Sequence, residues 1–230
     1  VRVTPNDGNV DGAFTETSML IDNSIPTIAT PIISSNGGVY TDSVLTCSTT
    51  ASDVDEVVTP TYAWQINGSV YNGATLDLSN YTVSVGDSIT CSATVIDSNG
   101  GMANAQTSDI VENRAPSVSS VSISPTSPTS IQVLTCSHSA TDPDGESLTA
   151  SYEWFVNGPS VGLANTLDLG AIGATPFDLV ECVVTVSDAA GASDSMTSSA
   201  TVLNTDPTVD VLTLTPAEPT LNDTLSCYAE

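Results

Sequence analysis

The chain has 230 residues, enough for one large domain or two of ordinary size, and its charge is strongly one-sided. It carries 27 acidic residues against two basic ones, Arg2 and Arg114, and the formal net charge is −25. This charge repels nucleic acid and anionic membrane surfaces, which excludes both as partners. A hydrophobic content of 40% with short runs of Val, Ile, Leu and Thr indicates a folded β protein. No apolar run approaches the roughly 20 residues of a membrane helix, so no membrane insertion is expected in this segment.

The sequence repeats itself several times along the chain. Copies of a cysteine motif, VLTC, VLTC and TLSC, end at Cys47, Cys136 and Cys227, at intervals of 89 and 91 residues. TYAWQINGS around Trp64 returns as SYEWFVNGP around Trp154, 90 residues later. CSATVID from Cys91 returns as CVVTVSD from Cys182. Several independent motifs at one period predict tandem copies of one structural unit.

The linkers between the units set the expected domain boundaries. NSIP at 23–26 returns as NRAP at 113–116 and as NTDP at 204–207. The prediction is therefore two complete repeats, 26–115 and 116–206. Residues 1–25 match the C-terminal part of a preceding repeat, and residues 207–230 match the N-terminal part of a following one.

Each unit is predicted to be all-β. Its alternating apolar and polar segments are short, and Gly, Asn, Asp, Ser and Pro separate them about every ten residues. Asn67-Gly68 and Asn157-Gly158 follow the two tryptophan segments, which is the preference of a two-residue β-hairpin. No stretch has a sustained helical period.

A unit with cysteine, tryptophan and cysteine at these spacings resembles the immunoglobulin fold. The residue two before the second cysteine is Ile89 or Val180, where antibody domains have tyrosine. The motif GDSITC at 86–91 and the N-x-x-P linkers look instead like the tandem immunoglobulin-like and cadherin-like repeats of large bacterial or archaeal surface proteins. The resemblance implies Greek-key β-sandwiches arranged head to tail.

The same resemblance implies one intersheet disulfide in each sandwich. Cys47 would pair with Cys91 around Trp64, and Cys136 with Cys182 around Trp154. Cys227 would have its partner outside the sequence. Disulfides place a protein outside a reducing cytosol, so we expect an extracellular or cell-surface location.

Aspartates recur at a fixed distance from these cysteines. Asp53, Asp97, Asp142 and Asp188 each lie six residues after a cysteine. Six is even, so each aspartate points to the same side of its strand as the cysteine, at about 20 Å along it. Strands B and F of an immunoglobulin-like sandwich run in the same direction. Each complete repeat is therefore predicted to bring two aspartates together at one end.

Two interpretations of these acidic ends are open. Ca²⁺ takes six to eight oxygen ligands and accepts carboxylates and carbonyls alike, so the acids could form a metal site. The candidate ligands are Asp142, Asp144, Glu146 and Asp188 in the second repeat, Asp53, Asp55 and Asp97 in the first, and the linker residue Asn113. The sequence DPDG at 142–145 is equally favourable for a type I turn without any metal.

No catalytic arrangement is visible. His138 is the only histidine, and alternation from Cys136 makes it an inward-facing strand residue. The acids form no recognisable general acid and base pair, and no phosphate-binding glycine loop is present. The chain is not expected to be an enzyme.

The sequence thus favours a structural segment of a long extracellular protein. Its repeats would act as a stalk or build a homopolymeric filament, with Ca²⁺ stiffening the junctions between neighbouring repeats. The alternative is an adhesin module that binds carbohydrate or a surface protein through its loops. Units that resemble each other this closely are more typical of a stalk than of a specialised binding domain.

Overall fold

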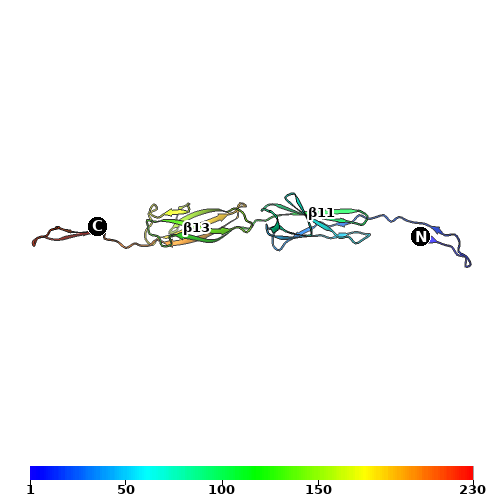
Figure 1. Cartoon of the computed structure of the whole chain (residues 1–230), viewed down its shortest axis with the longest axis horizontal. Coiled ribbons are helices and arrows are strands. Elements are labelled where there is room, and N and C mark those ends of the chain that lie inside the picture. Colours follow the sequence, from blue (N-terminus) through cyan, green and yellow to red (C-terminus); the bar gives the residue numbers. More distant parts are fainter. Residues whose placement is uncertain (230) are drawn as a thin grey trace. The chain divides into compact units, whose positions relative to one another are not determined.

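The computed structural model describes residues 1–229 and contains two β-sandwiches that follow each other along the chain (Figure 1). The chain divides into two compact units, Val1–Asn113 and a second that begins at Arg114. In the first unit the elements are β1 (Arg2–Val3), β2 (Thr15–Glu16), β3 (Thr27–Ile28), β4 (Ile32–Ser34), β5 (Val44–Ser48), β6 (Ala51–Ser52), β7 (Thr61–Ile66), β8 (Ser69–Asn72), β9 (Thr75–Asp77), the short 3-10 helix η1 (Leu78–Asn80), β10 (Ser88–Ile96) and β11 (Met102–Ile110).

The second unit has a similar order of elements, and its first three strands are longer than those of the first sandwich. Its elements are β12 (Ser117–Ser124), β13 (Val133–Thr141), β14 (Thr149–Val156), β15 (Ser160–Gly162), β16 (Thr166–Asp168), β17 (Leu179–Ser187), β18 (Ser193–Thr201), β19 (Leu212–Thr215) and β20 (Ser226–Ala229).

Each sandwich has one four-stranded and one three-stranded antiparallel sheet, and the first also has the two-stranded sheet β3-β6. The large sheets have the strand orders β11-β10-β7-β8 and β15-β14-β17-β18, and the small ones β4-β5-β9 and β12-β13-β16. Hairpins within a sheet alternate with connections that cross between the sheets, as from β5 to β7 and from β9 to β10, which is the Greek-key arrangement of an immunoglobulin-like sandwich. The predicted all-β immunoglobulin-like fold is confirmed.

Alternating burial along the strands builds the two cores. In β10 and β17 every second side chain is buried, and these side chains face the opposite sheet. Trp64 and Trp154 are fully buried among aliphatic residues, and Leu45, Leu78 and Ile89 or Leu134, Leu169 and Val180 surround them. The predicted hairpin turns are present, since Asn67 and Asn157 have φ of 47° and 52° and each is followed by a positive-φ glycine.

A disulfide joins the two sheets of each sandwich beside the tryptophan. Cys47 on β5 bonds Cys91 on β10, and Cys136 on β13 bonds Cys182 on β17. The Cα atoms of the pairs are 6.4 and 6.5 Å apart. Both predicted pairings are confirmed, and the described part of the chain contains no partner for the exposed Cys227.

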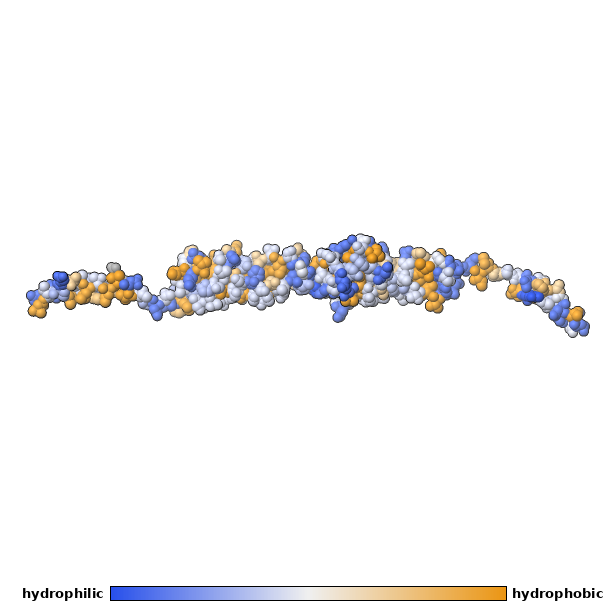
Figure 2. Space-filling view, in the orientation of Figure 1, coloured by the Kyte–Doolittle hydropathy of each residue, from blue (hydrophilic) through white to orange (hydrophobic). Residues whose placement is uncertain are grey.

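The hairpins β1–β2 and β19–β20 lie outside the two cores. Their apolar side chains, among them Val3, Phe14, Leu212 and Leu214, are exposed, and Figure 2 shows the corresponding apolar surface along both hairpins. A two-stranded hairpin by itself has no second layer against which to bury such residues.

Removing one disulfide is expected to destabilise its own sandwich only. In the double variant Cys47→Ala/Cys91→Ala, 44 residues are no longer closed into a loop in the unfolded chain, which corresponds to about 4 kcal/mol of unfolding free energy. Calorimetry of the whole chain should show the transition of the first sandwich shifted downward and that of the second unchanged. A loss below about 1 kcal/mol would contradict a stabilising role for this bond.

Candidate functional site

The acidic residues of the second sandwich gather at the end that carries the loops 142–148 and 188–192, here called the second tip. Residue 142 follows β13 and residue 188 follows β17. β14 and β17 are antiparallel with Thr149 opposite Ser187, so the loop before β14 and the loop after β17 lie side by side. β13 and β17 correspond to strands B and F of an immunoglobulin-like sandwich, and both end at this tip, as expected.

Three carboxylates at the second tip form a close group. Asp142, Glu146 and Asp188 each offer an oxygen, and these oxygens all lie within 4.8 Å of one another. Asp188 is only 8% exposed, and the other two are half-buried. Such a group could hold a metal ion, because three negative charges this close repel one another unless a cation or a proton compensates them.

Backbone hydrogen bonds fix two of these carboxylates in place. Asp142 Oδ1 accepts from the N–H of Asp144 at 2.7 Å and from the N–H of Glu146 at 3.3 Å. Asp188 Oδ1 accepts from the N–H of Ala192 at 2.8 Å. The N–H of Gly145 donates to the carbonyl of Asp142 at 3.3 Å, so the predicted tight turn is present as well. The turn and the carboxylate group therefore coexist.

Two oxygens of the group are shielded from solvent and have no hydrogen-bond partner in the structure. They are Asp142 Oδ2 and Glu146 Oε2. A shielded carboxylate oxygen without a donor is costly, and native proteins satisfy the great majority of such atoms. Burial raises the pKa of Glu146, and the charges of Asp188, Asp142 and Asp144 raise it further. The site lacks positive charge directed at these oxygens.

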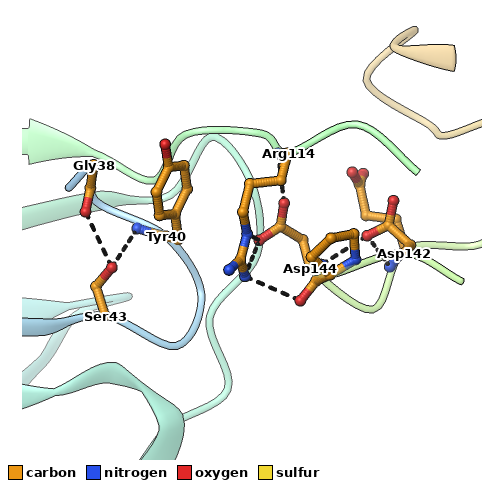
Figure 3. Close-up of polar contacts among 8 residues, drawn as sticks. Gly38, Tyr40, Ser43, Arg114, Asp142 and Asp144 are labelled. Carbon is orange, nitrogen blue, oxygen red and sulfur yellow. Dashed lines mark hydrogen bonds and ion pairs between the residues drawn. The ribbon is translucent and has the colours of Figure 1, made fainter. Parts of the chain in front are cut away.

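Asp144 has a different role, because it holds the linker (Figure 3). Its Oδ2 accepts from the backbone N–H of Arg114 at 2.6 Å, and its Oδ1 accepts from Arg114 Nε at 3.1 Å and Nη2 at 2.9 Å. Arg114 Nη2 also donates to the carbonyl of Pro143. The Asp144 side chain is completely buried under this ion pair. The arginine compensates the charge of Asp144, and this ion pair does not include the three grouped carboxylates.

The first sandwich has a tip of the same design with other partners. Asp53 Oδ1 accepts from the N–H of Asp55, and Asp55 Oδ2 accepts from the linker N–H of Ser24, at 2.7 and 2.6 Å. These bonds correspond to Asp142–Asp144 and Asp144–Arg114 in the second sandwich. Ser24 occupies the position of Arg114, so the first tip has the backbone clamp but lacks the arginine charge.

Hydrogen-bond donors of the protein itself surround the acids of the first tip. Asp97 is 6% exposed and accepts from Asn23 Nδ2 at 2.8 Å and from the backbone N–H groups of Asn99 and Gly101. The bond from Asn23 and these backbone bonds lower the pKa of Asp97. Glu56 accepts from the N–H of Ser98 in the neighbouring loop. Among the described residues, the close carboxylate group occurs at the second tip and has no counterpart here.

The structure thus brings together three of the eight metal ligands that the sequence suggests. Asp144 pairs with Arg114, and Asp53, Asp55 and Asp97 bind protein N–H groups while Asp53 Oδ2 is shielded and lacks a partner. Asn113 is the last residue of the first unit, and its part in a site stays a prediction.

Sequence reasoning missed three contributors to the tips, namely Glu56, Asn23 and the Arg114–Asp144 pair. Glu56 aligns with Glu146 once the single extra residue of the second loop is allowed for, since the aspartates are 89 residues apart and the tryptophans 90. His138 is half-buried and lies 3.0 Å from the Tyr152 hydroxyl through Nδ1, which agrees with the expected packing role.

No protein-family model matches the chain, and no curated protein matches it. Among solved structures, one described as a Ca²⁺-stabilized adhesin that helps an Antarctic bacterium reach out and bind ice is similar at a TM-score of 0.35 and 18% identity. The similarity covers 93% of this chain and 58% of that one, so this chain spans less than two thirds of the adhesin structure.

Two further solved structures are similar at lower scores. Fibronectin(III)-like modules of Clostridium thermocellum CbhA give a TM-score of 0.28 at 13% identity, with 75% of this chain and 94% of that one covered. Drosophila N-cadherin EC1-4 gives 0.27 at 12% identity, with 92% and 58% covered. These scores are low, and none of the three similarities bears on what the chain does.

Asp144→Asn is expected to destabilise the second sandwich by about 1–3 kcal/mol, because a buried charge-assisted pair with Arg114 is lost. The matched control is Asp55→Asn, which loses a charge on one exposed backbone bond and should cost less than about 1 kcal/mol in the first sandwich. Calorimetry measures both, and hydrogen exchange of the Arg114 and Ser24 amides reports the clamps. Equal costs in the two sandwiches would contradict a stabilising contribution from the arginine.

Proposed function

We propose that the chain is a structural segment of a long extracellular protein, built of tandem immunoglobulin-like repeats and stiffened by Ca²⁺ bound at the second tip. The observation that carries the proposal is the group Asp142, Glu146 and Asp188, with two shielded oxygens that have no donor. A divalent cation would satisfy both oxygens and remove the repulsion among the three charges.

The chemistry of the group favours Ca²⁺ among divalent cations. All its ligands are oxygens, which suits a hard cation and is unlike the Cys and His sets that hold zinc. Ca²⁺–oxygen distances of about 2.3–2.6 Å allow two ligands on opposite sides of one ion to lie roughly 5 Å apart. The 4.8 Å limit within the group is compatible with such a site. Backbone carbonyls and water would complete the coordination shell.

An extracellular location is supported by the two intersheet disulfides, since such bonds persist in oxidising compartments. Among the described residues no helix is long and apolar enough to cross a membrane. Extracellular Ca²⁺-binding modules work at dissociation constants of about 10⁻⁴–10⁻³ M, so a site of three carboxylates need not bind tightly to be occupied outside a cell.

The mechanism of the segment would be geometric. Residues 26–115 and 116–206 act as two repeats, and residues 1–25 and 207–230 belong to adjoining ones. At each tip an aspartate of the first loop holds a linker N–H, Ser24 on Asp55 and Arg114 on Asp144. A cation bound to Asp142, Glu146 and Asp188 would tie both loops of the second tip into one rigid unit. Repeats joined in this way would form a stalk or a filament.

The alternative, a recognition module for carbohydrate or a surface protein, is favoured by one feature outside the tips. The outer face of the first large sheet contains a hollow lined by uncharged residues. A binding face and a stalk are compatible functions of one chain.

Calcium is expected to stabilise the second sandwich selectively. At a concentration a hundredfold above the dissociation constant, the gain in unfolding free energy is about 2.7 kcal/mol, because the ion binds the folded tip. Calorimetry of the EDTA-treated chain with and without added Ca²⁺ measures this gain, with Mg²⁺ as a comparison. An unchanged second transition would rule out the proposed site.

Glu146→Gln should have opposite effects in the two states. Without Ca²⁺ it should raise the melting temperature at pH 7, because the raised pKa shows that the ionised carboxyl destabilises the fold. This gain should vanish below about pH 4, where the glutamate is protonated in both the folded and unfolded chain. With Ca²⁺ the variant should show at least a tenfold weaker affinity.

The matched control for this variant is Glu153→Gln, at a half-buried position in the middle of β14 and outside the carboxylate group. It should leave the calcium-dependent gain unchanged. If Glu146→Gln keeps the full calcium effect, Glu146 is not a ligand.

A further inference from the structure

The outer face of the large sheet in the first sandwich is uncharged, although the chain carries 27 acidic residues. Alternation along β7, β8, β10 and β11 places every second side chain on this face, here called the amide face. Its rows, read from the strand register, are Thr61–Thr94–Asn104, Asn72–Ala63–Ser92–Gln106 and Val70–Gln65–Thr90–Ser108. No row contains an acidic or basic residue.

Four amide side chains are concentrated on this face. They are Gln65, Asn72, Asn104 and Gln106, all exposed, and within residues 1–229 none of them hydrogen-bonds another protein group through its side chain. Each amide offers two donors and an acceptor side by side. Other asparagines of this unit are engaged by carboxylates, as Asn67 is with Asp87 at 2.9 Å and Asn23 with Asp97. The amide face therefore presents hydrogen-bonding groups that the fold does not use.

A hollow of about 690 Å³ lies in the amide face between β7, β8 and β10. Its lining includes Thr61, Ala63, Asn72, Gly73, Ser92 and Thr94. Tyr62 also borders it, but the Tyr62 hydroxyl accepts a bond from the N–H of Thr49 and is held by the protein. The volume lies within the range of about 300–1,000 Å³ that small-molecule sites occupy.

The second sandwich shows what fills the same place when no hollow is formed. The strand pairing aligns Ala63, Asn72 and Ser92 with Glu153, Leu163 and Val183. The hollow there shrinks to about 220 Å³. The four amide positions are also lost, since Phe155, Leu163, Ser195 and Thr197 replace Gln65, Asn72, Asn104 and Gln106. Two repeats with one fold thus differ in a coordinated way at this face.

We propose that the amide face is a binding site for a neutral oligosaccharide. Amide and hydroxyl groups can hydrogen-bond adjacent sugar hydroxyls in pairs, as donors and acceptors at once. Anionic ligands are disfavoured, because the chain has a net charge of −25 and the hollow contains no cation to offset it. A protein partner is disfavoured because the hollow has no Trp, Arg or Met anchor, and its single aromatic residue, Tyr62, is held by the protein through its hydroxyl.

The test is a titration of the whole ¹⁵N-labelled chain with defined hexasaccharides, followed by amide chemical shifts. The neutral probes are maltohexaose, cellohexaose and mannohexaose, and the anionic comparison is hexagalacturonate. At least one neutral probe should shift amides of β7, β8, β10 and β11 and leave the equivalent strands of the second sandwich unchanged. No shift with any neutral probe at millimolar concentration, shifts of equal size in both sandwiches, or equal binding of the anionic probe would overturn the proposal.

Substitutions on the amide face test which residues bind the sugar. Ala63→Glu/Ser92→Val fills the hollow and should weaken binding at least tenfold. Gln106→Glu keeps the shape and adds one charge, and it should weaken binding severalfold while the fold is retained. Thr197→Ala at the position of Gln106 in the second sandwich is the matched control and should change nothing. Unchanged affinity in both first-sandwich variants would refute the site.

The proposals of a carbohydrate site and of a calcium site are tested by separate measurements, so either can be refuted without the other. Carbohydrate binding is read from shifts on the first sandwich, and calcium binding from the melting of the second. Titrations repeated in EDTA and in Ca²⁺ should give the same affinity for the sugar, because the amide face and the second tip belong to different compact units. Calcium-dependent sugar binding would contradict this assignment.

Discussion

The disulfide between the two sheets, packed against a buried tryptophan, is the constraint on which the rest of each sandwich depends. The cores are built from small aliphatic residues, with one large side chain, Trp64 or Trp154, at each centre. Cys47–Cys91 and Cys136–Cys182 fix the facing strands at a single register. Because side chains alternate with a period of two, a fixed cysteine determines the direction of every other residue on its strand.

That constraint reaches from the core to the tips. Each aspartate six residues after a cysteine emerges where its strand ends, with its side chain on the inner side, and Asp97 and Asp188 are consequently buried although they are charged. The fold therefore delivers two carboxylates to one place in each sandwich. The groups that surround these carboxylates come from the linkers and loops, and the strand register does not fix their positions. Asn23 and Glu56 enter the first tip, and Arg114 and Glu146 enter the second.

The resemblance to immunoglobulin-like repeats was sufficient to predict the fold and the disulfides, and strand alternation from the cysteines predicted the meeting of the acidic loops. The Arg114–Asp144 pair could not be predicted in this way, since it depends on how a linker side chain folds back over a loop. The hollow of the amide face could not be predicted from the sequence either. It results from the small volumes of Ala63 on β7, Ser92 on β10 and Gly73 just after β8, and the register brings Ala63 and Ser92 opposite each other.

The carboxylates of the two tips have different partners. A bound cation would therefore affect the two tips differently. In the first tip amide and backbone donors already satisfy Asp97, and its pKa is lowered accordingly, so the carboxylate is stable without a metal. In the second tip the arginine is committed to Asp144, so Asp142, Glu146 and Asp188 retain up to three negative charges. A divalent ion would reduce that excess to one. Stiffening of the first tip would then be permanent, and stiffening of the second would follow the calcium concentration of the surroundings.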